Sequence, residues 1–222
     1  MYSANFTPSP PERAQSQASR PKSCQPGIIL IRNDYRPLGS EDGPDKVDLM
    51  AKTVELRRHT DADGDVLTAD GVREAVQIGR RLEGGYDLLI SSGAQRATQT
   101  LACFLAGLGQ PLANGAVVDA GFRSVVEERW FAAARSAQGK DLEAFRRVDP
   151  ELVEKESLLL GRALKAVFEK LPDGGRALIV GHSPTTEAAV LGLTGQVVPP
   201  ISKGAGVRVV EQDGRHLVEP LP

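Results

Sequence analysis

Three residues with reactive or anion-binding side chains lie far apart in the sequence but in similar local settings. They are His59, Arg96 and His182, and each closes or follows a short apolar, strand-like run and precedes a helix-like segment. In an open parallel α/β sheet, such positions meet at the carboxyl edge, where ligands bind. Two imidazoles and a guanidinium at one edge would surround a single anion. This chemistry suits a phosphate site with a histidine nucleophile.

The setting of His59 favours a nucleophilic role. A neutral imidazole is a good phosphoryl acceptor, and neighbouring arginines disfavour the imidazolium while they bind the phosphoryl oxygens. Arg58 is adjacent and Arg57 is one residue further back. Because side chains alternate along a strand, we expect only one of these two arginines to face the site.

Arg96 and His182 each lie near the predicted start of a helix, which supports a role for both in anion binding. Arg96 is expected in the first turn of a helix, whose free backbone N–H groups can also face an anion. His182 precedes Ser183 and Pro184, which predict a helix with Ser183 as its cap and Pro184 at the first position. The remaining histidine, His216, lies in the predicted C-terminal hairpin, and we expect it to be exposed and without a role.

Composition excludes several other classes of protein. The chain has 222 residues, of which 41% are hydrophobic and 25% charged, and its net charge is -2, which is typical of a globular protein with one sizeable core. This balance gives no long-range attraction to nucleic acid or to an anionic membrane. We see no apolar stretch of the ~20 residues that a membrane span needs. With only Cys24 and Cys103, we expect no structural disulfide and a cytoplasmic location.

Residues 1–49 differ from the rest of the chain. Their first half is polar and rich in proline, a composition that cannot bury a core. Met50 stands just before the first convincing strand. Two interpretations stay open for this extension: a reading frame that starts too early, with Met50 as the true start, or a disordered tail. In either case the folded domain is predicted to span 50–222.

From residue 53 onward, strand-like and helix-like segments alternate. The pattern predicts strands near 53–57, 86–91, 116–119 and 177–180, with helices after 68, 95, 150 and 184. A hairpin at 206–219 closes the chain around an Asp213-Gly214 turn. For the segment 120–148, the pattern predicts an irregular structure at its start, followed by short helices around Trp130 and Phe145. These elements indicate an α/β sandwich whose sheet is mostly parallel with an antiparallel edge.

Four ordered motifs resemble those of the histidine phosphatase superfamily, also called phosphoglycerate mutase-like. They are Leu56-Arg57-Arg58-His59-Thr60, Leu67-Thr68-Ala69-Asp70-Gly71, Ser91-Ser92-x-x-x-Arg96-Ala97-x-Gln99-Thr100 and Val180-Gly181-His182. The resemblance covers about residues 53–220 and implies a three-layer phosphoglycerate mutase-like fold. It also implies that His59 is the phosphohistidine nucleophile, that Arg58 and Arg96 bind phosphate, and that His182 is the second histidine of the pocket. The family uses no metal, so we expect no metal site and no cofactor.

The sequence departs from the family pattern in two ways, and these departures indicate which branch of the family it resembles. Thr60 stands where the family usually has glycine, so its hydroxyl becomes a candidate phosphate ligand together with Ser183. The long substrate insert of phosphoglycerate mutases and their acid in a Glu-Arg-His-Tyr-Gly setting are both missing. The compact length and the Lys203-Gly204-Ala205-Gly206 ending are more similar to the small bacterial phosphohistidine phosphatases.

The general acid that protonates a leaving alcohol has several candidates. Glu127 and Glu128, just before Trp130, lie in the region where relatives often carry their acid. Asp61 is another candidate because it follows the nucleophile closely. A phosphoramidate substrate such as phosphohistidine would depend less on this acid, since its leaving group differs.

Together these features predict a metal-independent phosphatase that hydrolyses a phosphomonoester or phosphoramidate through a phosphohistidine on His59. The partner is then a phosphorylated small molecule or a phosphohistidine protein. Three alternatives stay open: a phospho-ligand binding module that has lost turnover, a phosphomutase, and an unrelated nucleotide-binding domain. The last lacks support, because we find neither a Gly-x-x-x-x-Gly-Lys-Ser/Thr loop nor a Gly-x-Gly-x-x-Gly turn. The sequence leaves the oligomeric state open.

Overall fold

A computed structural model describes residues 51–111 and 114–222 of the chain. Both interpretations of segment 1–49, with the start at Met50, fall outside the described residues, as does Cys24. Within the described ranges, no helix has the length and apolar character required to cross a bilayer.

The described chain alternates strands and helices much as the sequence predicts. The strands are β1 (Lys52–Arg58), β2 (Ala62–Asp63), β3 (Val66–Leu67), β4 (Leu88–Ser91), β5 (Ala116–Val118), β6 (Arg176–Gly181), β7 (Gly206–Gln212) and β8 (Arg215–Leu221). The helices are α1 (Ala69–Gly79), α2 (Gln95–Leu108), α3 (Glu127–Ser136), α4 (Leu142–Val148), α5 (Pro150–Lys170) and α6 (Thr185–Thr194), with a 3-10 turn η1 (Ala120–Phe122). The segment 120–148 thus resolves into η1, α3 and α4.

Six of these strands form one mixed sheet in the order β5-β4-β6-β1-β7-β8. The strands β5, β4, β6 and β1 run parallel to one another, whereas β7 and β8 are antiparallel to their neighbours. The predicted mostly parallel sheet with an antiparallel edge is therefore confirmed. The strands β2 and β3 form a separate two-stranded hairpin.

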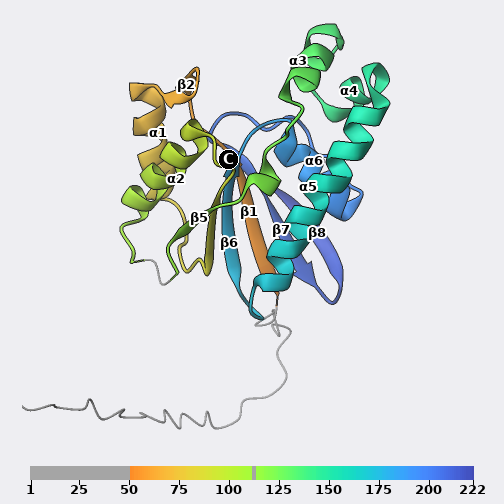
Figure 1. Ribbon diagram of the computed structural model, residues 1–222. Helices are drawn as coiled ribbons and strands as arrows, with labels where there is room; N and C mark the ends of the chain where they lie inside the picture. Colours follow the sequence, from red (N-terminus) through yellow and green to blue (C-terminus); the bar gives the residue numbers. More distant parts are fainter. Residues whose placement is uncertain (1–50, 112–113) are drawn as a thin grey trace, which may run out of the picture. The chain divides into compact units, whose positions relative to one another are not determined.

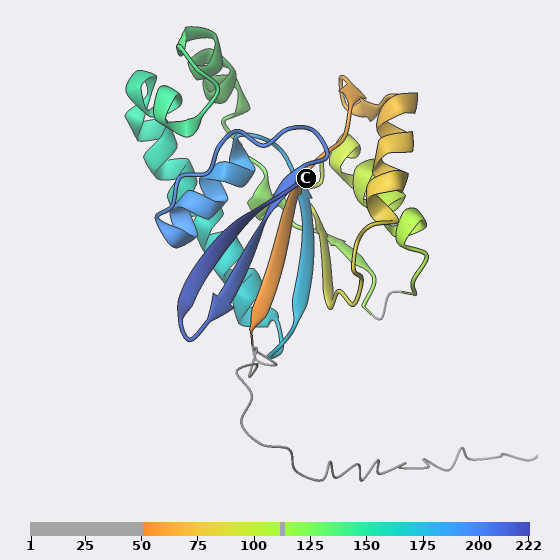
Figure 2. The same cartoon turned by 180° about the vertical axis from the view of Figure 1, so that it is seen from behind.

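Helices cover the sheet in two separate layers, which completes the three-layer sandwich (Figures 1 and 2). The helices α1 and α2 pack against each other on one face, and α5 and α6 pack on the other. Alternate side chains of β6 serve both layers: Leu178 and Val180 join the α1–α2 core, while Ala177 and Ile179 join the α5–α6 core. Both cores therefore hold β6, the strand that ends next to His182.

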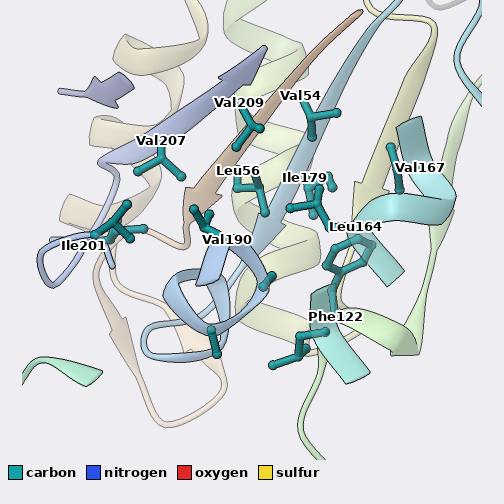
Figure 3. Packing of buried hydrophobic residues seen from close by; sticks show 14 of the residues in the cluster. Val54, Leu56, Phe122, Leu164, Val167, Ile179, Val190, Ile201, Val207 and Val209 are labelled. Atoms are coloured by element: carbon teal, nitrogen blue, oxygen red, sulfur yellow. The ribbon is translucent and has the colours of Figure 1, made fainter. Parts of the chain in front are cut away.

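The larger core lies between the sheet and α5–α6. Figure 3 shows Leu56 of β1, Ile179 of β6 and Val209 of β7 facing Leu164 of α5, and all four side chains are buried. Truncation of a side chain packed in this way costs about 2–5 kcal/mol. The burial of Leu56 and Ile179 thus stabilises the two strands whose ends carry the predicted site.

Local sequence signals explain where several helices begin and end. The Thr68 side chain accepts a hydrogen bond from Gly71 N and so caps α1, and Asp149 caps α5 ahead of Pro150 in the same way. The prediction that His216 is exposed is wrong. This residue is half-buried, stacks edge-on against Phe168 and lies 3.3 Å from a carboxylate oxygen of Glu211.

Candidate active site

A cavity of about 310 Å³ opens at the carboxyl edge of the sheet, where β1 and β6 end. Its lining includes Arg58, His59, Arg96 and His182. The structure therefore brings together the four side chains on which the sequence prediction depends. The β2–β3 hairpin and α3 both lie beyond this edge of the sheet (Figures 1 and 2) and contribute further lining residues, Gly64 from the first and Glu127 from the second.

The hydrogen bonds of His59 define its tautomer. Its backbone N–H donates to Gly181 O (3.0 Å), which holds the end of β1 against β6. Its Nδ1 lies 2.7 Å from the carbonyl oxygen of Thr60, and because a carbonyl only accepts, Nδ1 must carry the proton. The lone pair is therefore on Nε2, which accepts a bond from Nε of Arg96 at 3.3 Å. A neutral His59 presents the nitrogen that a phosphoryl acceptor needs.

His182 lies beside His59 in the same cavity. The two ring centroids are 5.2 Å apart and the rings are tilted by 60°. The Nε2 atom of His182 lies 3.0 Å from Ser92 Oγ, which fixes the ring, while its Nδ1 has no hydrogen-bond partner within the described part of the chain. This nitrogen is buried in the protein and is not exposed to the cavity.

Burial keeps both imidazoles neutral. Desolvation lowers the pKa of His59 to about 4; the bond to Thr60 O opposes this effect, and the charges of Arg96 and Arg58 add to it. Desolvation likewise lowers the pKa of His182 to about 3, helped by the charge of Arg96. At neutral pH, the site therefore holds two uncharged rings among cationic guanidinium groups.

The two consecutive arginines of β1 point to opposite faces of the strand, as the alternation predicts. Arg58 lines the cavity, where its Nη1 donates to Ile201 O (2.9 Å). Arg57 is buried elsewhere, donates to Gly204 O (3.2 Å), and lies 3.6 Å from Glu55. Arg58 is thus free to serve the site, while Arg57 belongs to the internal structure.

Arg96 has a carboxylate partner that the sequence analysis missed. Its Nη1 donates to Oδ1 of Asp65 (2.9 Å), and Oδ2 of Asp65 also accepts a bond from Gln95 N (3.2 Å). Asp65 lies in the turn between β2 and β3, next to Gly64, whose φ is +56°. The only local signal was this Asp-Gly-Asp turn, which says nothing about a partner 31 residues away.

The structure separates the three candidates for the general acid. Glu127, at the start of α3, lines the cavity, and its Oε1 accepts a bond from Arg123 (2.8 Å). Glu128 is exposed and does not line this cavity. Asp61 is bound to Lys203 (2.5 Å) and to the Thr68 hydroxyl (2.8 Å), also outside the cavity lining. Only Glu127 of the three lies where a leaving group could reach it.

The structure does not bring the Thr60 hydroxyl to the site. Thr60 is fully buried, its Oγ lies 3.3 Å from Thr100 Oγ, and neither hydroxyl is part of the cavity lining. What Thr60 does contribute is its carbonyl oxygen, which holds Nδ1 of His59. The side chain therefore packs away from the cavity, against Thr100.

Ser183 lies in the cavity lining, but its predicted role as a helix cap is wrong. Helix α6 begins at Thr185 and its cap position, Pro184, makes no side-chain cap bond. The Ser183 hydroxyl donates instead to the buried carboxylate of Glu187 (2.5 Å), which also accepts a bond from Ile201 N (2.8 Å). A buried carboxylate attracts this hydroxyl more strongly than a free backbone N–H group does.

Apolar side chains form the outer part of the cavity. Trp130 and Phe131 of α3 stand in the lining with Ala62 and Pro184. Trp130 is buried and packs against Phe145 of α4, whereas Phe131 is about half exposed. The cavity thus has a charged inner end and an apolar mouth.

A family comparison agrees with this geometry. The model of the histidine phosphatase superfamily (branch 1) matches residues 49–206. A comparison with curated protein sequences gave no match.

Solved structures share the fold at low sequence identity. Phosphoglycerate mutase from Bacillus anthracis is 20% identical over 78% of this chain and 94% of its own, with a TM-score of 0.61. Phosphoserine phosphatase from Entamoeba histolytica, in complex with 3-phosphoglyceric acid, is 13% identical over 77% and 97%, with a TM-score of 0.59. The protein histidine phosphatase SixA, complexed with tungstate, is 18% identical over 76% and 96%, with a TM-score of 0.51.

Proposed function

Because the chain belongs to the histidine phosphatase superfamily, we propose that it is a metal-independent phosphatase with a phosphohistidine intermediate on His59. The observation that carries this proposal is the state of His59. Its Nε2 bears a lone pair, its pKa lies well below neutrality, and it shares one cavity with Arg58, Arg96 and His182. These are the requirements for a nucleophile that works on a phosphoryl dianion at neutral pH.

The proposed reaction has two steps. Nε2 of His59 attacks phosphorus, so that the N–P bond forms as the bond to the leaving oxygen breaks and Glu127 supplies the proton to that oxygen. Arg58 and Arg96 balance the charge on the equatorial oxygens, and the imidazole of His182 lines the same cavity beside them. Water then attacks phosphorus and gives a proton to the Glu127 carboxylate, the N–P bond breaks, and the products are inorganic phosphate and free His59.

The substrate is a phosphorylated small molecule or a phosphohistidine protein, acted on in the cytoplasm. The structural relatives support both classes by their names, since they include a phosphoserine phosphatase and a protein histidine phosphatase. A cavity of about 310 Å³ accommodates a small phosphomonoester or a single modified side chain.

The decisive experiment compares the native enzyme with His59→Ala. We expect the native protein to hydrolyse p-nitrophenyl phosphate in the presence of a chelator and to trap an acid-labile ³²P label, and His59→Ala to lose both with unchanged thermal unfolding. Turnover by the folded variant would refute the proposal. Phosphate binding without any turnover or label in the native protein would instead identify a phospho-ligand binding module.

A further inference from the structure

The carboxylate of Asp65 binds the guanidinium of Arg96, as a phosphoryl group would. Its Oδ1 accepts from Nη1 of Arg96 (2.9 Å) and its Oδ2 accepts from Gln95 N (3.2 Å), so it binds both the guanidinium and the first turn of α2. A guanidinium and the free N–H groups of a helix start are also the donors that phosphate prefers. The protein's own carboxylate thus already occupies donors that the substrate would use.

The same guanidinium also covers the nucleophile. From its bond to Asp65, Arg96 extends to His59, where its Nε donates to Nε2 at 3.3 Å. An in-line attack requires phosphorus about 3–3.5 Å from Nε2 along its lone pair. In the structure, that direction is taken by the N–H group of Arg96. Substrate binding must therefore draw the guanidinium off His59 and onto the phosphoryl oxygens.

We propose that Asp65 is a positioning residue that holds Arg96 over His59 in the free enzyme and competes with the phosphoryl group for its guanidinium. The inference rests on the proposed phosphatase function, because it assigns Arg96 to the phosphoryl oxygens. Asp65 is 48% exposed and stands on a hairpin of two-residue strands, so its ion pair with Arg96 is easily opened to water. A dianion displaces this single carboxylate charge, and the carboxylate restores the resting position when phosphate leaves.

Removing the charge of Asp65 should strengthen phosphate binding. In Asp65→Asn, the amide oxygen still accepts from Gln95 N while the competing charge is gone, so we expect inorganic phosphate to bind about three- to tenfold more tightly. The matched control is Asp63→Asn, which removes an equal charge from the same hairpin at a residue that does not pair with Arg96. We expect its affinity to stay within about twofold of the native value.

The test is calorimetric titration of the full chain and of both variants with inorganic phosphate at low ionic strength, with thermal unfolding as a check of folding. For p-nitrophenyl phosphate, Asp65→Asn should lower KM more than it changes kcat. Unchanged or weaker phosphate binding in Asp65→Asn would overturn the inference, as would an equal gain in Asp63→Asn. Because the titration needs no turnover, tighter binding in Asp65→Asn without a ³²P label on native His59 would uphold the competition while refuting the phosphatase proposal.

Discussion

The two ends of the cavity are built in opposite ways. At the inner end, His59 and His182 are 7% and 9% exposed, and hydrogen bonds to neighbouring groups fix both rings. At the mouth, Glu127 and Phe131 stand on α3, where Phe131 is 51% exposed and Glu127 pairs with Arg123 near the surface. The inner end lies at the packed edge of the sheet, whereas the mouth is formed by α3, which lies outside the sheet.

This difference assigns separate tasks to the two ends. A phosphoryl group is the same in every substrate of the family, so its binding groups can be rigid and buried. The leaving group differs between substrates, and an exposed helix between β5 and α5 can change without disturbing the sheet. We therefore expect substitutions at the inner end to change the rate with every substrate, and those at the mouth to change the order of preference among substrates.

The largest effect is expected at the inner end, from Arg58→Ala. Loss of a guanidinium that balances transition-state charge should lower kcat/KM about 10³-fold with all substrates. Its neighbour provides the control: Arg57→Ala removes one of three arginines paired with Glu55 and a hydrogen bond to Gly204 O, so it should lower the free energy of unfolding by about 2 kcal/mol and spare the activity of folded molecules. Steady-state kinetics and urea unfolding of both variants measure these effects. Equal activity losses per folded molecule would contradict the division between the two arginines.

At the mouth, Glu127→Gln should act selectively. An alkyl phosphate needs a proton on its leaving oxygen, so we expect its kcat to fall about 10²-fold, whereas p-nitrophenyl phosphate, with a stable leaving anion, should be affected only a few-fold. Glu128→Gln, outside the cavity, should leave both substrates unaffected. An equal loss with both substrates would show that Glu127 does not act as the acid.

A smaller effect concerns the protonation of the inner end. With pKa values near 4 and 3, His59 and His182 should keep the carbon-13 chemical shifts of neutral imidazole from pH 8 down to about pH 5. Unfolded histidines take up protons near pH 6.5, so the free energy of unfolding should fall as the pH drops from about 6.5 towards 4. Replacing His59 with Asn should reduce that slope. A midpoint near pH 6.5 for either ring would contradict the described burial.

The smallest expected effect is that of Phe131→Ala on substrate preference. Loss of the half-exposed ring should raise KM for an aryl phosphate about three- to tenfold and hardly change KM for methyl phosphate. Val125→Ala, an exposed position in the same segment that does not line the cavity, serves as the matched control. Equal changes in KM for the two substrates would show that Phe131 does not contact the leaving group.

The inner end was predictable because its residues follow strong local signals. His59 and His182 follow apolar strand-like runs, and parallel strands bring their carboxyl ends to one edge. Alternation along β1 predicted that only one of Arg57 and Arg58 faces the site, and the resemblance to the family indicated Arg58. The fold class and the order of the major elements follow from the alternation of strand-like and helix-like segments.

The errors occurred where a specific side-chain partner outweighed the local pattern. Ser183 has the sequence of a helix cap, but its hydroxyl donates to the buried carboxylate of Glu187, which Ile201 N also contacts. Asp65 belongs to a turn in the sequence, and only the packing of the β2–β3 hairpin on α2 reveals its bond to Arg96. The segment 120–148 lacked strong periodicity because its helices α3 and α4 are short and each buries only a few residues.

The central strand β6 has a consequence for how the molecule opens. It lies between β4 and β1, and each face of it belongs to a different apolar core, so its backbone amides can exchange with solvent only when both cores separate. Helix α3 buries only Trp130 and Ala133 and can detach in a far cheaper, local fluctuation. We therefore expect local opening at α3 to widen the cavity while His59 and His182 keep their positions and the sheet stays folded.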